Sequence, residues 1–143
     1  MLLLDTDHIT ILQHASGERF ERLRLRLQAV KDVEPVCVSI ISIEEQMRGW
    51  MSVIAKERKV ERQILSYREL GNLFTFYARF QRLPFEQGAA RQFADFRSMK
   101  IKIGTMDLKI AAIAKVEQAK VLSANLSDFR QVPGLQVENW LDS

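Results

Sequence analysis

The chain has 143 residues, of which 47% are apolar and 27% charged, which is ordinary for a globular protein large enough to form a core. We predict a single domain over residues 1–143. No apolar run approaches the roughly 18 residues of a transmembrane helix and no leader resembles a signal peptide, so we expect no membrane association. The only cysteine, Cys37, cannot form an internal disulfide, which favours a reducing, cytoplasmic setting.

The charge balance is modestly basic, with 21 Lys and Arg against 18 Asp and Glu and a sequence pI of about 9.2. If four acids gather in one pocket, 21 basic residues face 14 acidic ones over the rest of the chain. A basic rim around an acidic centre suits a phosphate-backbone substrate met by a metal. A solvated surface explains the charge alone equally well.

Apolar runs and periodic stretches alternate along the chain. The runs predict strands at residues 2–4, 36–41, 121–123 and 135–137, with a short one at 83–85. Periodic stretches predict helices over residues 20–30, 89–99 and 106–119, and two long helices between 43 and about 83 that meet near Lys59 or Gly71. The alternation favours a three-layer α/β/α fold with a mainly parallel central sheet and a protruding antiparallel helical hairpin. Helix 20–30 has arginines opposite its apolar stripe, at positions 19, 22, 24 and 26.

Aromatic residues gather on the second long helix, at Phe74, Phe76, Tyr77 and Phe80. Interleaved with Arg79 and Arg82 they could stack bases, but such a stripe is more often core or a subunit interface. We therefore expect a homodimer formed through the long helices.

Acidic residues recur where predicted strands give way to helices. Asp5 follows the first strand, Glu44 and Glu45 follow the second, Asp107 stands at a helix start and Asp128 follows the late strand. Acids after parallel strands converge on one edge of the sheet. Carboxylates gathered there repel one another unless divalent cations neutralise them, and oxygen-only ligands suit Mg²⁺ or Mn²⁺.

Each acid also has a purely structural explanation. Ser42 and Glu45 have the spacing of a capping box, and Asp107 in a first turn is favoured by the helix dipole. Asp5 can cap the helix that follows it, and Asp128 can cap or turn a loop. Because all four acids occur together and in this order, a shared site explains them better than four separate structural roles.

The chain resembles PIN-domain proteins of the VapC type, the toxins of bacterial toxin–antitoxin pairs. The stretches that carry the resemblance are Leu4-Asp5-Thr6-Asp7 and residues 39–49, 103–112, 123–129 and 132–140. The family pattern places its second acid three residues after a Ser or Thr and four before a Gly, which selects Glu45. Glu44 beside it and Gln46 in place of the usual leucine depart from the pattern, as does Ser123 in place of a frequent Thr.

The resemblance implies a metal-dependent endoribonuclease in which Asp5, Glu45, Asp107 and Asp128 are catalytic and hold Mg²⁺ or Mn²⁺. It also assigns a supporting role at the site to five further residues, which are Thr6, Asp7, Glu44, Ser123 and Asn125. An RNA phosphodiester is then hydrolysed by a metal-activated water without a covalent intermediate. The resemblance also implies a small antitoxin partner that covers the site.

Two other functions are compatible with parts of the sequence. Asp5-Thr6-Asp7 after an apolar strand is typical of haloacid-dehalogenase-like phosphatases, with Asp5 as nucleophile, although Ile9 stands where that family has Thr. A PIN-like module that binds RNA or protein without turnover is the other alternative. The presence of all four acids argues against it.

Overall fold

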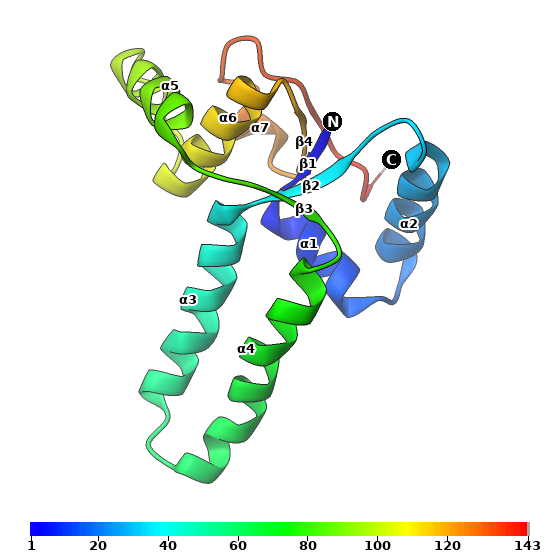
Figure 1. Ribbon diagram of the computed structural model, residues 1–143, viewed down its shortest axis with the longest axis vertical. Helices are drawn as coiled ribbons and strands as arrows, with labels where there is room; N and C mark the ends of the chain where they lie inside the picture. Colours follow the sequence, from blue (N-terminus) through cyan, green and yellow to red (C-terminus); the bar gives the residue numbers. More distant parts are fainter. Residues whose placement is uncertain (143) are drawn as a thin grey trace.

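The computed structural model describes residues 1–142, which form a five-stranded sheet surrounded by helices (Figure 1). Its elements in chain order are β1 (Leu2–Leu4), α1 (Thr6–His14), α2 (Glu18–Val30), β2 (Val36–Ser39), α3 (Ile40–Lys56), the 3-10 turn η1 (Val60–Gln63), α4 (Ile64–Tyr77), β3 (Gln81–Leu83), α5 (Gln87–Ser98), α6 (Thr105–Glu117), β4 (Lys120–Leu122), α7 (Leu126–Phe129) and β5 (Val137–Glu138). None of the helices described has the length and apolar character needed to cross a membrane.

The strands lie in the order β3-β2-β1-β4-β5, and every neighbouring pair is parallel. Leu3 of β1 lies opposite Cys37 of β2 on one side and Val121 of β4 on the other. The chain adds β2 and β3 on one side of β1 and then returns to add β4 and β5 on the other. The carboxyl ends of β1 and β4 are therefore neighbours at the point where strand order reverses, where ligands bind in open α/β sheets.

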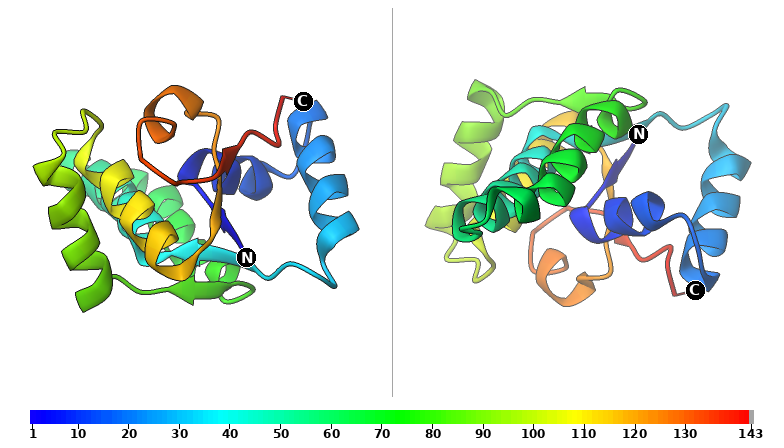
Figure 2. Two further views of the ribbon diagram at one scale, coloured as in Figure 1. Left: turned by 90° about the horizontal axis from the view of Figure 1, so that it is seen from above. Right: turned by 90° about the horizontal axis from the view of Figure 1, so that it is seen from below.

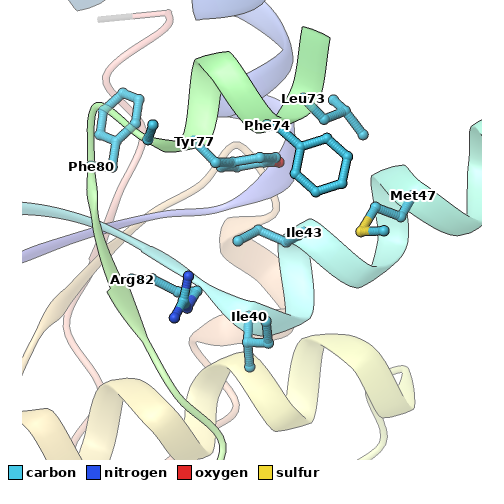
Figure 3. Close-up of a pocket in the computed structure, with 9 residues that line it drawn as sticks. Ile40, Ile43, Met47, Leu73, Phe74, Tyr77, Phe80 and Arg82 are labelled. Atoms are coloured by element: carbon cyan, nitrogen blue, oxygen red, sulfur yellow. The ribbon is translucent and has the colours of Figure 1, made fainter. Parts of the chain in front are cut away.

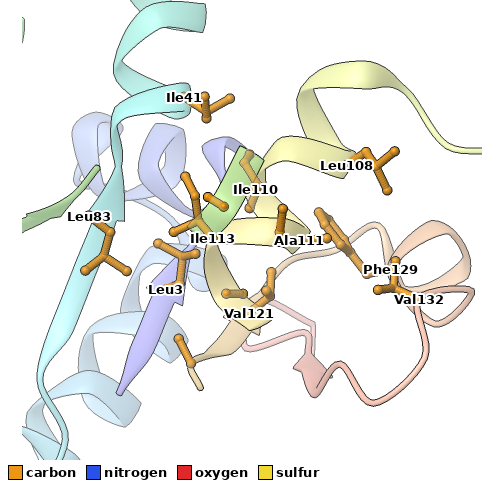
Figure 4. Close-up of a cluster of buried hydrophobic side chains, with 14 of the residues drawn as sticks. Leu3, Ile41, Leu83, Leu108, Ile110, Ala111, Ile113, Val121, Phe129 and Val132 are labelled. Carbon is orange, nitrogen blue, oxygen red and sulfur yellow. The ribbon is translucent and has the colours of Figure 1, made fainter. Parts of the chain in front are cut away.

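Apolar side chains from successive residues of β1 enter two separate cores. Leu3 faces α6 and α7, where it joins Ile113 and Phe129 (Figure 4), and Phe96 of α5 belongs to the same core. Leu2 and Leu4 face the opposite side, which α1, α2, α4 and the C-terminal segment cover. Figure 2 shows these helices on both sides of the strands. The predicted three-layer α/β/α arrangement is confirmed.

Helices α3 and α4 form a hairpin that projects from the rest of the molecule (Figure 1). The chain reverses between residues 57 and 63, close to Lys59, whereas Gly71 lies inside α4. The Gln63 side chain closes the turn by donating to the carbonyls of Ile54 at 2.9 Å and Glu57 at 3.0 Å. The predicted antiparallel pair is thus present, and it turns at the first of the two expected points.

Several element boundaries differ from those predicted. The second strand ends at Ser39 rather than residue 41, because the Ser39 hydroxyl accepts the Ser42 N–H at 3.1 Å and caps α3. The alternative explanation of Ser42 and Glu45 as a capping box is therefore wrong, and the Glu45 side chain takes no part in capping. The expected strand at 83–85 lies instead at Gln81–Leu83, and that at 135–137 at Val137–Glu138.

Candidate active site at the carboxyl edge of the sheet

Asp5 lies directly after β1 and is only 6% exposed. Its carboxylate accepts the Thr6 N–H at 2.8 Å, which caps α1, and the Ser123 hydroxyl at 2.7 Å. Burial, together with the charges of Asp7 and Asp107, raises the pKa of Asp5 to about 6 despite these hydrogen bonds. Asp5 therefore both caps a helix and carries a carboxylate whose ionisation is unfavourable.

Glu45, on the first turns of α3, is the glutamate that faces Asp5. The Thr6 hydroxyl bridges the two elements, lying 3.0 Å from the Ser42 hydroxyl and 3.5 Å from Glu45 Oε2. Burial and the charges of Asp5 and Asp107 raise the pKa of Glu45. Glu44 instead pairs with the exposed Arg48 at 2.6 Å, one turn along the helix. Of the two adjacent glutamates, Glu45 is therefore the one that lies near Asp5.

Asp107 and Asp128 come from the starts of α6 and α7 and share one partner. The Asn125 side-chain amide donates to Asp107 Oδ2 at 3.2 Å and to Asp128 Oδ2 at 2.9 Å. Burial raises the pKa of Asp107, and the charge of Asp128 adds to the shift while the Asn125 bond opposes it. The Asn125 amide thus holds Asp128 of the short helix α7 beside Asp107 of the longer helix α6.

Asp7 is the second residue of α1, and its carboxylate points toward the β4–α7 connection. Its carboxylate accepts the Ala124 N–H at 2.8 Å and lies 2.7 Å from His8 Nδ1. Burial opposes the charge of Asp7, but the bonds from His8 and from the Ala124 N–H outweigh it and lower the pKa of this carboxyl. Asp7 therefore differs from Asp5, Glu45 and Asp107, whose pKa values are all raised.

The donor set fits a hard divalent cation in its chemistry. All four candidate ligands are carboxylates, and the pKa values of Asp5, Glu45 and Asp107 are raised by burial and by one another's charge. No ion pair within residues 1–142 neutralises any of the four. As the side chains of the described residues lie, no three of the acidic, His or Cys groups are close enough together to hold a metal ion. The carboxylates thus supply suitable oxygen ligands, while Asn125 bridges two of them.

The sequence did not predict the role of His8 in this region. His8 is fully buried, and its Nε2 accepts the Trp140 N–H at 3.2 Å while its Nδ1 faces Asp7. The sequence signal was available in the adjacent Asp7-His8 pair. Its second partner lies 132 positions away, beyond the reach of any local pattern.

Comparison with known families decides the assignment of the chain. The sequence profile of the PIN domain matches residues 2–135, nearly the whole chain. The chain belongs to the PIN-domain family. A search of curated proteins found no match.

Solved structures show the same fold. Chains of VapBC2 from Rickettsia felis bound to a DNA fragment from their promoter and of DNA-bound VapBC from Salmonella typhimurium both give TM-scores of 0.72. Their sequence identities are 22% and 24%; each comparison covers 97% of this chain, and 98% and 97% of those chains. FitAcB from Neisseria gonorrhoeae gives a TM-score of 0.71 at 23% identity over the full length of both chains. The predicted resemblance to PIN-domain proteins of the VapC type is confirmed.

The family assignment leaves the phosphatase alternative without its main support. In that alternative Asp7 acts as an acid/base beside a nucleophilic Asp5. Here Asp7 is held by His8 and the Ala124 N–H, and it accepts from both. These two structural hydrogen bonds already occupy the Asp7 carboxylate.

Proposed function

We propose that this PIN-domain protein is a metal-dependent endoribonuclease and the toxin of a toxin–antitoxin pair. The observation that carries the proposal is the group of one buried and three half-buried carboxylates at the strand-order reversal, with raised pKa values at Asp5, Glu45 and Asp107. Such an arrangement lowers stability unless a cation relieves it, and perturbed groups of this kind cluster at functional sites.

In this mechanism the four acids, Asp5, Glu45, Asp107 and Asp128, hold one or two Mg²⁺ or Mn²⁺ ions. A bound ion of this kind supplies a polarised water and neutralises phosphate charge. The chain's own contribution is orientation: the Ser123 hydroxyl and the Thr6 N–H fix the Asp5 carboxylate. The Thr6 hydroxyl aligns Glu45, and the Asn125 amide sets Asp107 beside Asp128.

The antitoxin partner is proposed because the similar solved structures are of VapBC and FitAcB complexes. We expect a small protein that covers the carboxylate cluster with a basic side chain, since the cluster has no cationic partner among residues 1–142. The free, buried Cys37 is compatible with action in a reducing cytoplasm.

A homodimer through the long helices is supported by the apolar surface of the hairpin. An open pocket of about 490 Å³ lies where α3, α4 and β3 meet, and its lining includes Ile40, Met47 and Phe74 (Figure 3). Phe74 is 67% exposed and Ile40 36%. Exposed apolar clusters of this kind mark protein–protein contacts, so we place the dimer contact on this face.

Cleavage of a labelled single-stranded RNA with Mn²⁺ tests the enzymatic proposal. We expect cleavage by the wild type that stops with EDTA and is lost in Asp5→Asn and Asp107→Asn. Equal cleavage by the wild type and both variants would remove the catalytic assignment. Binding of the RNA without cleavage in Mn²⁺ or Mg²⁺ would favour the non-catalytic binding module.

A further inference from the structure

Asp7 and His8 connect two segments that are distant in the sequence. Asp7 accepts from His8 Nδ1 at 2.7 Å and from the Ala124 N–H at 2.8 Å, while His8 Nε2 lies 3.2 Å from the Trp140 backbone nitrogen. A backbone N–H only donates, so Nε2 is the acceptor and the ring proton sits on Nδ1, directed at Asp7. The donor and the acceptor of each of these three hydrogen bonds are thereby fixed.

The C-terminal segment, residues 140–142, is held on its outer side by α2. Arg19 donates two bonds to the Asp142 carboxylate, at 2.9 and 2.8 Å, and Arg22 donates to the Leu141 carbonyl. The Arg26 guanidinium lies 4.4 Å from the centre of the Trp140 ring. These arginines are spaced three and four residues apart, so they share one face of the helix.

The fourth arginine of this helix behaves differently. Arg24 pairs with Glu21 on α2 itself, with its shortest contact at 2.8 Å. Within residues 1–142 it makes no hydrogen bond or ion pair with the C-terminal segment, so it offers a matched control for the other three.

The other end of the connection reaches the carboxylate cluster. Ala124, held by Asp7, immediately precedes Asn125, whose amide bridges Asp107 and Asp128. Two further bonds, from the Ser123 hydroxyl to Asp5 and from the Asn125 N–H to the Ser123 hydroxyl, tighten the same turn. A shift of Ala124 therefore moves the amide that sets the spacing of two carboxylates.

We propose that Asp7 and His8 are positioning residues that transmit the placement of the C-terminal segment to Asn125 and so set the spacing of Asp107 and Asp128. The consequence for metal binding and cleavage rests on the proposed function. The positioning itself is a property of the metal-free fold and can be measured there.

Two substitutions of His8 separate its two hydrogen bonds. In His8→Asn the amide nitrogen takes the place of Nδ1 and can still donate to Asp7, but the side chain is too short to reach Trp140. In His8→Gln the amide lies near the place of Nε2 and can accept the Trp140 N–H, but the bond to Asp7 is lost. The pair thus tests which link controls Asn125.

The measurement is the NMR resonance of the Asn125 side-chain amide in metal-free protein, followed by Mn²⁺ affinity from calorimetry. We expect His8→Gln to shift the Asn125 resonance and to weaken Mn²⁺ binding about 10- to 100-fold, the usual effect of losing a residue that orients a ligand. We expect His8→Asn to change both quantities less. An unchanged Asn125 resonance in folded His8→Gln would overturn the proposal.

A second pair of variants keeps the test decisive if a His8 variant does not fold. Arg22→Ala loosens the C-terminal segment and should move the Asn125 resonance in the same direction, whereas Arg24→Ala should leave it in place. Equal spectra for the two arginine variants would contradict transmission from this segment. If the wild type does not cleave RNA, the proposed function fails, while the Asn125 resonances still decide the positioning role.

Discussion

The carboxylate edge of the sheet and the helical hairpin both hold groups in surroundings that disfavour them, but in opposite ways. At the edge, Asp5 is buried and the other acids are half-buried near it, and burial together with mutual repulsion raises the pKa values of Asp5, Glu45 and Asp107. On the hairpin, large apolar side chains are exposed, with Phe74 at 67% and Val60 at 75%. One region lacks charge compensation and the other lacks an apolar cover.

The two deficits call for different partners. Crowded oxygen ligands are relieved by a small divalent cation, which needs only a few ligands. An exposed apolar face needs a large complementary surface, which only another macromolecule can supply. The comparison therefore separates a chemical site from a docking surface, and variants in one region should leave the other intact.

The largest expected effect is on cleavage and distinguishes the two adjacent glutamates. Glu45→Gln should lower kcat by more than the roughly 10- to 100-fold that loss of a ligand-orienting residue costs, because it removes a carboxylate from the cluster. Glu44→Gln is the matched control, since Glu44 pairs with exposed Arg48. Equal losses in the two variants, measured with labelled RNA and Mn²⁺, would refute the placement of Glu45 in the site.

The next effect concerns the dependence of stability on pH. The folded state binds the Asp5 proton more tightly than the unfolded state, because its pKa is about 6 against an ordinary 3.8. Stability from this group is full below pH 4 and is lost as the pH rises to about 6, by an amount on the order of 3 kcal/mol.

Urea unfolding of the wild type and Asp5→Asn, both in EDTA, measures this loss. The variant should gain stability relative to the wild type between pH 4 and pH 7.5. A relative stability that does not change between these pH values would contradict the raised pKa.

The smallest expected effect concerns dimerisation through the hairpin, which a substitution there should weaken without unfolding the protein. Phe74→Glu places a charge on an exposed side chain of the pocket in Figure 3, so the fold should be preserved while the dimer dissociation constant rises at least about tenfold. Leu25→Glu on α2, at a side chain 57% exposed, is the control. Sedimentation that shows a monomeric wild type, or equal dimerisation of both variants, would contradict the dimer proposal.

Sequence reasoning succeeded where local patterns carry the information. Apolar runs located β1 and β4, and acids at strand ends predicted that Asp5 and Glu45 lie near one another, because parallel strands bring their carboxyl ends to one edge. The family pattern selected Glu45 over Glu44, and Glu45 is the one that lies near Asp5 in the structure. The catalytic roles of these acids remain predictions.

The remainder depends on contacts between distant residues. Ser39 ends β2 because its hydroxyl caps α3, and the apolar residues 40 and 41 that follow it continue the pattern of a strand. His8 acquires its role from Trp140, and Asn125 from two helices that meet only in the fold. Side-chain hydrogen bonds between distant residues follow no sequence periodicity, so they could not be predicted from the sequence.

Calorimetric titration of Mn²⁺ into the metal-free protein tests most directly whether the carboxylate edge is a cation site. The wild type should bind Mn²⁺, Glu44→Gln should bind it with the same affinity, and Asp107→Asn should lose measurable binding. Absence of binding to the wild type, or equal binding to Asp107→Asn, would contradict the central claim.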